Sequence, residues 1–377
     1  MNKVTSASSA SQLNKSALAN LEAGTYDVLV FCHLRWDFVY QRPQHLISRL
    51  ASKFKILMIE EPVGFEEGAE PQANIIEINP QLHILQPKVN TIEDIAALIP
   101  KYVTNTQVDI GWFYSAAFSP LIKKLNFNTI VYDCMDELSL FKGASQVLIT
   151  QEQYLLQQAD VVFTGGKSLY EVKKKMHDKV FCFPSSVDEM HFAQAKNDIA
   201  IPEDILSIKT PIVGYFGVID ERIDLELIKN IAASLPQISF VMIGPLAKIN
   251  DADLPRLPNI HYLGMKSYNE LPHYLKAFDI AMMPFSLNDA TKYISPTKTL
   301  EYMAAGKPII STRIKDVARD YSRCVKIIEN ADDFCAAIVA TIESQASYDS
   351  DYDEILSNTS WDTTAKRMKS IIQEVEK

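Results

Sequence analysis

Short apolar segments typical of β-strands alternate with helical patterns along almost the whole chain. Alternation of this kind predicts parallel sheets with helices on both faces. In the first half, the expected strands are residues 27–33, 55–60, 83–86, 108–114, 129–133, 161–164 and 180–183. The expected helices between them are residues 41–53, 91–101, 151–158 and 168–176.

The pattern lapses between residues 185 and 210, where a polar connection that contains proline takes its place. It resumes with expected strands at 211–217, 239–244, 260–263, 279–284 and 308–312, and with helices at 225–234 and 268–276. A chain of 377 residues is long enough for two separate cores. We therefore expect a flexible tail at 1–25, an N-terminal Rossmann-like domain at 26–195 and a C-terminal Rossmann-like domain at 196–360.

The last segment, residues 361–377, is expected to form an amphipathic helix. Its apolar face carries Trp361, Ala365, Met368, Ile371 and Ile372. No strand follows this helix, so it could pack across both domains; packing on its own domain alone is an equally good alternative.

Composition excludes several functional classes. The net charge of −10 argues against a nucleic-acid partner, which would need a basic face. The five cysteines show no C-x-x-C spacing, which favours reduced thiols in a cytosolic protein. No apolar run reaches the roughly 18 residues that span a bilayer, and the first 25 residues lack a signal-peptide core. We expect a cytoplasmic protein that could still contact the inner membrane face peripherally.

The segment Ser-Pro-Thr-Lys-Thr-Leu-Glu-Tyr-Met-Ala-Ala-Gly-Lys-Pro at residues 295–308 is predicted to be a capped helix. Ser295 is a good N-cap, and Pro296 suits the first helical position because its missing N–H is not needed there. Gly306 ends the helix, and Pro308 prevents its continuation.

Two polar side chains share one face of this helix. Lys298 and Glu301 lie three residues apart, so both can reach one ligand. Free N–H groups near Pro296 and Thr297 form a site for phosphate oxygens, whose charge Lys298 would neutralise. Glu301, one turn deeper, could accept hydrogen bonds from paired hydroxyls. Ligands of α/β sheets collect where strands give way to helices, so we predict a sugar-nucleotide site here instead of a solvated helix face.

Polar residues also follow expected strands in the N-terminal half. His33 and Arg42 belong to a loop that lacks the glycines of ordinary Rossmann phosphate loops and could contact the acceptor or a donor phosphate. Asp133 and Asp136 follow a later strand, where an acid could orient an acceptor hydroxyl or take its proton. N-capping of the next helix is the other interpretation of these acids. We take all four residues as catalytic candidates.

Two further motifs are expected to carry no chemistry. Gly166-Lys167-Ser168 has the appearance of a P-loop ending, but Val161 stands where the first glycine is required. We interpret it as a strand-to-helix turn. The run Lys173-Lys174-Lys175 is interpreted as solvated charge, although such a run can also touch anionic lipid.

The motif at 295–308 resembles the donor site of glycosyltransferase family 4, and more closely the branch called glycosyl transferases group 1, which occurs in exopolysaccharide and teichuronic-acid gene sets. Three other stretches agree with that branch: Tyr-Gln-Arg-Pro-Gln-His-Leu at 40–46, Tyr-Asp-Cys-Met-Asp-Glu at 132–137 and Gly-Tyr-Phe-Gly-Val-Ile-Asp at 214–220. The resemblance covers roughly residues 26–375.

This resemblance implies the α/β fold called GT-B, in which two Rossmann-like, doubly wound parallel-sheet domains face an interdomain cleft. The N-terminal domain of such enzymes mainly binds the acceptor, and the C-terminal domain binds the nucleotide sugar. The implied activity is that of a retaining glycosyltransferase of the hexosyltransferase type. It would move a sugar from a nucleoside-diphosphate sugar to a saccharide or lipid-linked glycan, in cell-surface polysaccharide biosynthesis. Neither a metal nor another cofactor is expected.

The resemblance also bears on single residues. Relatives often place a diphosphate-binding Arg or Lys where this chain has Arg222, but pairing with neighbouring acids is an equal alternative. Gly217 would allow close backbone approach, or would simply end a strand. The wider family has two glutamates separated by seven residues; the second corresponds to Glu301, but the first is replaced by Tyr293. This replacement leaves a non-catalytic partner subunit as an alternative function. A sugar-nucleotide epimerase or related hydrolase of the same fold is another alternative, because it shares the nucleotide site.

Overall fold

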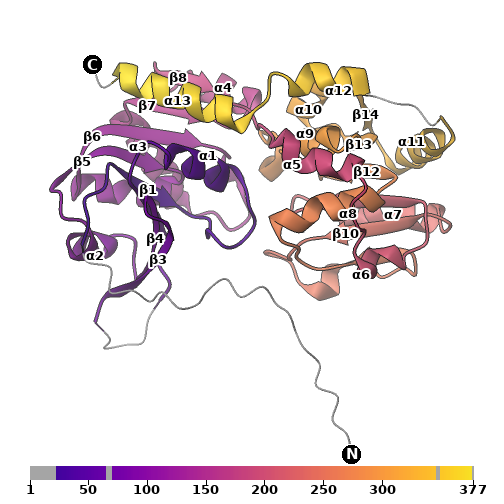
Figure 1. Ribbon diagram of the computed structural model, residues 1–377, viewed down its shortest axis with the longest axis horizontal. Helices are drawn as coiled ribbons and strands as arrows, with labels where there is room; N and C mark the ends of the chain where they lie inside the picture. Colours follow the sequence, from indigo (N-terminus) through magenta and orange to yellow (C-terminus); the bar gives the residue numbers. More distant parts are fainter. Residues whose placement is uncertain (1–22, 65–69, 345–348, 376–377) are drawn as a thin grey trace, which may run out of the picture.

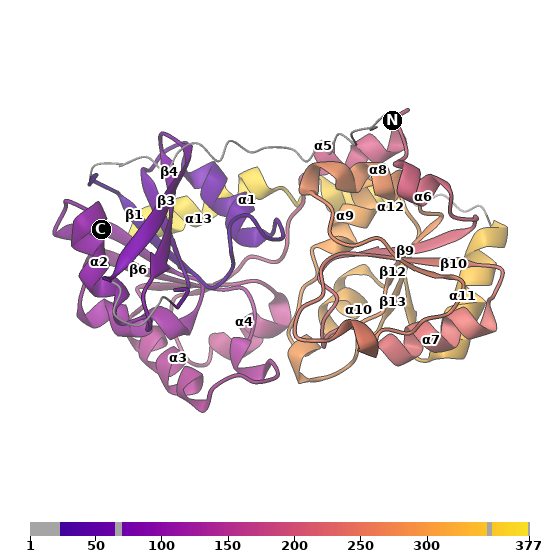
Figure 2. The same ribbon diagram turned by 90° about the horizontal axis from the view of Figure 1, so that it is seen from below.

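The computed structural model describes residues 23–64, 70–344 and 349–375. It contains two α/β domains that lie side by side (Figures 1 and 2). Nearly all of the tail expected at residues 1–25 lies outside the described residues.

The N-terminal domain is built on an eight-stranded sheet with the strand order β3-β4-β2-β1-β5-β6-β7-β8. All neighbouring strands are parallel except β3 and β4, which are antiparallel. The strands are β1 (Val28–Cys32), β2 (Ile56–Glu60), β3 (Gln72–Asn79), β4 (Leu82–Lys88), β5 (Gln107–Phe113), β6 (Asn126–Cys134), β7 (Val161–Thr164) and β8 (Val180–Cys182). The helices are α1 (Arg42–Leu50), α2 (Ile95–Tyr102), α3 (Gln146–Gln158) and α4 (Lys167–Lys173), with 3-10 turns η1 (Ala116–Lys123) and η2 (Leu138–Leu140).

The C-terminal domain is built on a six-stranded, fully parallel sheet with the order β11-β10-β9-β12-β13-β14. Its strands are β9 (Ile212–Phe216), β10 (Ser239–Ile243), β11 (Ile260–Tyr262), β12 (Ile280–Met283), β13 (Ile309–Thr312) and β14 (Val325–Ile328). Its α-helices are α5 (Glu189–Phe192), α6 (Glu203–Leu206), α7 (Leu225–Ser234), α8 (Leu271–Ala277), α9 (Lys298–Ala304), α10 (Lys315–Tyr321), α11 (Ala331–Ser344) and α12 (Asp349–Leu356). Its 3-10 turns are η3 (Ala193–Lys196), η4 (Asp251–Asp253), η5 (Tyr268–Glu270) and η6 (Asp289–Thr291).

The central strands of both sheets are buried on both faces, as parallel strands with flanking helices require. The central strands β1 and β9 read Val-Leu-Val-Phe-Cys and Ile-Val-Gly-Tyr-Phe, and every residue in them is buried. Separate apolar clusters cover the two faces of the N-terminal sheet, and a third forms the core of the C-terminal domain. The expected pair of doubly wound domains is therefore confirmed.

The chain crosses between the domains twice. After β8 it passes into the C-terminal domain, whose core includes Val187 and Phe192. The chain therefore enters this domain before the expected boundary at 195–196. It returns at Ser360, which pairs with Val187 in an isolated parallel bridge. The last helix, α13 (Trp361–Val375), lies on the N-terminal domain next to α1 (Figure 1). Its apolar face completes that domain's core and not the core of the domain that precedes it.

Two strands were not predicted. Strand β3 is an exposed antiparallel edge strand, and its alternation of polar and apolar residues is weak. Strand β14 is a short edge of the second sheet. Among the described residues, no helix is both long and apolar enough to cross a membrane.

Candidate active site

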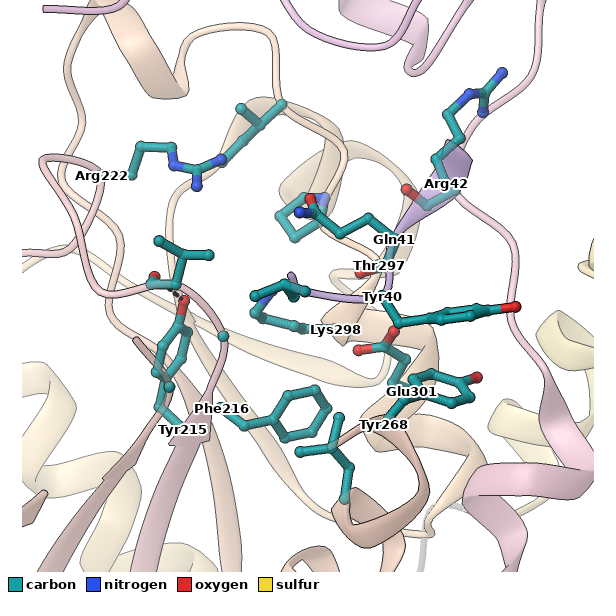
Figure 3. A pocket seen from close by; sticks show the side chains of 18 of the residues that line it. Tyr40, Gln41, Arg42, Tyr215, Phe216, Arg222, Tyr268, Thr297, Lys298 and Glu301 are labelled. Atoms are coloured by element: carbon teal, nitrogen blue, oxygen red, sulfur yellow. Dashed lines mark hydrogen bonds between the residues drawn. The ribbon is translucent and has the colours of Figure 1, made fainter. Parts of the chain in front are cut away.

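A pocket lies between the two domains, where central strands of both sheets end (Figure 3). The segments that follow β1 and β6 approach it from the N-terminal domain, and those that follow β9 and β10 approach it from the C-terminal domain. Helix α9 completes it. Its polar and glycine lining includes Tyr40, Gln41, Arg42, Asp136, Gly217, Arg222, Gly244, Thr297, Lys298 and Glu301.

Helix α9 begins later than the sequence predicted. Thr297 is its N-cap, and the first i to i−4 hydrogen bond runs from the Glu301 N–H to the Thr297 carbonyl at 3.1 Å. Ser295 is therefore not the cap, and Pro296 precedes the helix. The reason is that the Ser295 carbonyl accepts a hydrogen bond from the Ser185 hydroxyl at 2.5 Å, which ties it to the chain segment that joins the domains. Ser295, Pro296 and Thr297 all still line the pocket.

The end of α9 is as predicted. Gly306 adopts a φ of 68°, the left-handed conformation that glycine adopts without strain. The Gly306 N–H bonds to the Met303 carbonyl at 2.9 Å, and the Lys307 N–H bonds to the Tyr302 carbonyl at 3.0 Å. These two bonds form a Schellman motif, which fixes the length of the helix that carries Lys298.

Lys298 extends into the pocket without a direct ion-pair partner among the residues that the structure describes. Its ammonium lies 5.8 Å from the centre of the Tyr215 ring. Within the described ranges, no acidic side chain lies within ion-pair distance of its Nζ atom. Burial lowers the pKa of Lys298, although the charge of Glu301 partly offsets this effect. An anionic ligand would therefore stabilise the charged form of this buried lysine.

Glu301 points into the same pocket from one turn deeper in α9 (Figure 3). Its residue surface is only 6% exposed. Burial raises the pKa of Glu301 to about 7, against the opposing effects of Lys298 and of a hydrogen bond with Thr297. The carboxyl group is thus available to accept hydrogen bonds, and its charge depends on pH in the neutral range.

Gly217 makes room for Lys298, and Gly244 makes room for the backbone of Gly217. Gly217 has a φ of 138°, and a Cβ atom there would lie 2.1 Å from the Lys298 Cε atom. Gly244 has a φ of 146°, and its Cβ would lie 1.9 Å from the Gly217 carbonyl oxygen. Gly217 therefore directly follows β9 and leaves room for the Lys298 side chain, and its close approach to a ligand stays a prediction.

Arg222 lines the pocket and is also paired with an acid. Its Nη2 atom lies 2.7 Å from the Asp220 Oδ2 atom, and its Nε–H also donates to that carboxylate. The guanidinium lies 5.5 Å from the centre of the Phe141 ring, which belongs to the other domain. Pairing with a neighbouring acid, one of the two expected roles, is confirmed.

Asp136 approaches these cations from the N-terminal domain. It lines the pocket and is partly buried. Burial raises its pKa, and the opposing charges of Arg222, Arg42 and Lys298 moderate that rise. Asp136 is therefore the predicted acid that the structure brings to the cleft.

Asp133, by contrast, is fully buried and engaged by Arg42. The Arg42 Nη2 atom lies 2.9 Å from Asp133 Oδ1, and the Arg42 Nη1–H donates to the Phe183 carbonyl at 2.8 Å. A carboxylate held in this way cannot reach an acceptor hydroxyl, so the geometry contradicts direct contact for Asp133. The pair instead fixes the start of α1 to β6, and Arg42 lines the pocket.

His33 does not line the pocket, unlike Arg42, the other candidate in its loop. Its Nδ1 atom is buried without a hydrogen-bond partner among the residues that the structure describes. Burial and the nearby charge of Lys248 lower its pKa to about 4, so it is neutral near pH 7. Tyr293, which replaces the first family glutamate, lies outside the pocket lining and packs against the N-terminal core.

Sequence reasoning missed Tyr40 and Gln41, which face Lys298 and Glu301 across the pocket (Figure 3). They immediately precede Arg42 in the motif at 40–46. The buried Gln44 side chain accepts a hydrogen bond from the Gln41 N–H at 3.0 Å and donates to the Val39 carbonyl at 3.2 Å. The spacing of Gln41 and Gln44 matches a capping box and could have indicated this rigid turn.

Comparisons with known proteins agree with this geometry. Residues 210–344 match the family described as glycosyl transferases group 1. A Bacillus subtilis (strain 168) protein described as a teichuronic acid biosynthesis glycosyltransferase, TuaH, is 28% identical over 225 residues. That alignment covers 55% of this chain and 56% of the relative, so the match spans about half of its length.

Solved structures resemble the chain over nearly its full length. Sucrose-phosphate synthase from Thermosynechococcus elongatus has a TM-score of 0.70 at 15% identity, covering 92% of this chain and 98% of that one. An E. coli structure described as trehalose-6-phosphate bound with UDP-2-fluoro glucose has a TM-score of 0.66 at 12% identity, with the same coverage. These likenesses show the fold, which is GT-B. The expected resemblance to the glycosyl transferases group 1 is confirmed by the match of residues 210–344 and by the TuaH relative.

Proposed function

We propose that this protein, whose C-terminal domain matches the glycosyl transferases group 1, is a retaining glycosyltransferase of the hexosyltransferase type. It would move a sugar from a nucleoside-diphosphate sugar to a saccharide or lipid-linked glycan. One observation carries the proposal: Lys298 and Glu301 project from one helix face into the interdomain pocket, beside a backbone that two glycines open.

In this proposal the donor's diphosphate lies against Lys298 and the amides at the start of α9. Negative charge grows on the leaving diphosphate as the glycosidic bond breaks, so a fixed ammonium there stabilises the transition state. Arg222, which remains at the pocket while paired with Asp220, adds positive potential. Glu301 accepts hydrogen bonds from the ribose hydroxyls.

The acceptor is proposed to enter from the N-terminal side, past Tyr40, Gln41 and Asp136. Asp136 orients the acceptor hydroxyl or a hydroxyl of the transferred sugar. We assign no nucleophile to the protein. The leaving phosphate assists removal of the acceptor proton, so that the new bond forms on the face the old one leaves and configuration is retained.

Metal removal should leave transfer unchanged, because Lys298 and Arg222 supply the positive charge that a divalent cation supplies elsewhere. We expect rates with excess EDTA to stay within about twofold of those with added Mg²⁺, a difference below 0.5 kcal/mol in barrier. Initial rates of nucleoside diphosphate release measure this. A loss that Mg²⁺ restores would contradict the metal-independent proposal.

Donor affinity should rise with pH through the neutral range. The pKa of Glu301 is raised from 4.5 to about 7 in the free protein, and ribose hydroxyls bind its ionised form better. Dissociation constants for a nucleotide sugar should therefore fall up to about tenfold between pH 6 and pH 8. The Glu301→Gln variant should bind more weakly and show no such dependence. A wild-type affinity that stays flat over this range would contradict the role of Glu301.

The expected effect of pH on the stability of the fold is opposite to its effect on donor affinity. Because folding raises the pKa of Glu301, the unfolded chain ionises first, and the ligand-free protein loses stability as pH rises from 4.5 to about 7. Measuring both melting temperature and affinity therefore separates the effect on the donor from the effect on the fold.

The activity test incubates candidate UDP-, GDP- and dTDP-sugars with and without saccharide and lipid-linked acceptors. Glycosylated product that forms only with an acceptor, and that keeps the donor's anomeric configuration by NMR, is the expected result. Conversion of the donor alone would indicate an epimerase or hydrolase. Failure of every nucleotide sugar to raise the melting temperature would indicate a non-catalytic subunit.

The cellular setting is also a proposal. The match to a teichuronic acid biosynthesis protein supports cell-surface polysaccharide biosynthesis. We propose that the protein acts in the cytoplasm and that a lipid-linked acceptor would bring it to the inner membrane face.

A further inference from the structure

A buried lysine lies outside the pocket, on the helix that follows β7. Lys173 is only 1% exposed, so the expectation that the run 173–175 is solvated is wrong for its first member. Its Nζ atom lies 2.7 Å from Glu137 Oε2 and 2.6 Å from Glu152 Oε1. Burying these charges is costly, and apolar residues at such positions often give equal or greater stability. Stability alone therefore does not explain why these charged groups are buried together.

One of the two carboxylates belongs to a loop that reaches the other domain. We call residues 135–145, between β6 and α3, the bridging loop. Glu137 is its anchor on the N-terminal domain: one carboxylate oxygen meets Lys173, and the other accepts a hydrogen bond from Ser139 at 2.9 Å.

The far end of the bridging loop contacts the C-terminal domain. The Lys142 N–H lies 3.0 and 3.1 Å from the two carboxylate oxygens of Glu221. The Phe141 ring lies beneath two cations, 5.5 Å from the Arg222 guanidinium and 5.1 Å from the Lys248 ammonium. The loop thus spans the cleft beside Arg222, and it carries Asp136 in the pocket.

We propose that Lys173 and Glu137 are positioning residues, whose buried ion pair holds the bridging loop so that Asp136 stays at the pocket beside Arg222 and Lys298. This inference rests on the proposed function for its effect on catalysis, but not for its effect on the loop. Neither Lys173 nor Glu137 lines the pocket.

The two glutamates on Lys173 provide a matched test. Glu152 lies on α3, outside the bridging loop, and also accepts a hydrogen bond from the Tyr132 hydroxyl at 2.6 Å. Glu137→Ala and Glu152→Ala each leave Lys173 with one carboxylate. Glu152→Ala also leaves the tyrosine without its acceptor, so it should lower the melting temperature at least as much as Glu137→Ala.

The first measurement is hydrogen–deuterium exchange of the full-length, ligand-free variants. In Glu137→Ala, peptides that cover residues 136–142 should exchange at least about tenfold faster, whereas in Glu152→Ala they should match the wild type. Equal exchange of this segment in both variants would overturn the proposal. If Glu137→Ala does not fold, Glu137→Gln replaces it, with the same direction of change expected and the same result overturning it.

The second measurement is sugar transfer. Glu137→Ala should lower kcat at least about tenfold, because small displacements of a positioned group are costly. It should leave the dissociation constant of the nucleoside diphosphate within about twofold of the wild-type value. Glu152→Ala should change neither kcat nor this dissociation constant. Equal kcat values in the two variants would overturn the proposal that the ion pair of Glu137 supports catalysis. If the wild type transfers no sugar, the proposed function fails, while the exchange result still decides whether Glu137 holds the loop.

Discussion

Replacing Lys298 by alanine should lower kcat/KM for sugar transfer by about a thousandfold or more, the loss expected when a preorganised charge at a leaving group is removed. The ammonium lies in the pocket lining and has no acidic partner within ion-pair distance in the described parts of the chain, so no direct ion pair there neutralises its charge. Burial lowers its pKa, which means that the charged form is held at a cost in the empty protein. The melting temperature of Lys298→Ala should therefore equal or exceed that of the wild type.

Lys292 is the matched control for this variant. It precedes the same helix, is exposed, and lies 5.3 Å from the centre of the Tyr293 ring, away from the pocket lining. Lys292→Ala should keep kcat/KM within about twofold of the wild type. Near-normal transfer by Lys298→Ala would remove the assigned role, and an equal loss in both variants would point to a general change in net charge.

Replacing Gly244 by alanine should destabilise the protein by about 3 kcal/mol or more and abolish donor binding. The added Cβ would lie 1.9 Å from the Gly217 carbonyl oxygen, and a backbone atom cannot move aside as a flexible side chain can. The φ of 146° adds strain. Relief would require the ends of β9 and β10 to separate, which would displace the backbone against which Lys298 lies. Urea unfolding and a thermal-shift assay with nucleotide sugar measure the two effects.

Gly264 is the control for backbone strain alone. Its φ is 69°, but no atom lies within 4 Å of the position that a Cβ would occupy. Gly264→Ala should cost about 1 kcal/mol and leave donor binding intact. Similar losses of stability and of donor binding for Gly244→Ala and Gly264→Ala would mean that the close contact of the two strand ends contributes to neither.

The sequence predicted features that depend on local pattern. Continuous apolar strands between amphipathic helices specify parallel sheets, because only a strand buried on both faces can be apolar throughout. The end of α9 followed from Gly306 and the site face from the spacing of Lys298 and Glu301. These features need no knowledge of distant residues.

Features that depend on distant pairing were less predictable. Asp133 looked like a cleft acid because it follows a strand, but Arg42, far away in the sequence, occupies its carboxylate. Lys173 looked solvated because helical spacing cannot reveal that Glu137 and Glu152 meet it from two other elements. Ser295 looked like an N-cap until a hydrogen bond from Ser185 held its carbonyl outside the helix.

The return of the chain to the N-terminal domain also could not be predicted from local sequence pattern. The apolar face of α13 was evident, but amphipathicity does not say which core a helix completes. The bridge between Val187 and Ser360 brings the two crossings together and leads α13 onto the first domain. The antiparallel edge strand β3 escaped detection because an exposed edge needs no apolar run.

The most direct test of the account is calorimetric titration of the wild type, Lys298→Ala and Glu301→Ala with UDP, GDP and dTDP at pH 8. We predict that the wild type binds at least one of these nucleotides and that each variant weakens that binding at least about tenfold, or 1.4 kcal/mol. Binding of equal strength in all three proteins would place the nucleotide elsewhere and contradict the site described above.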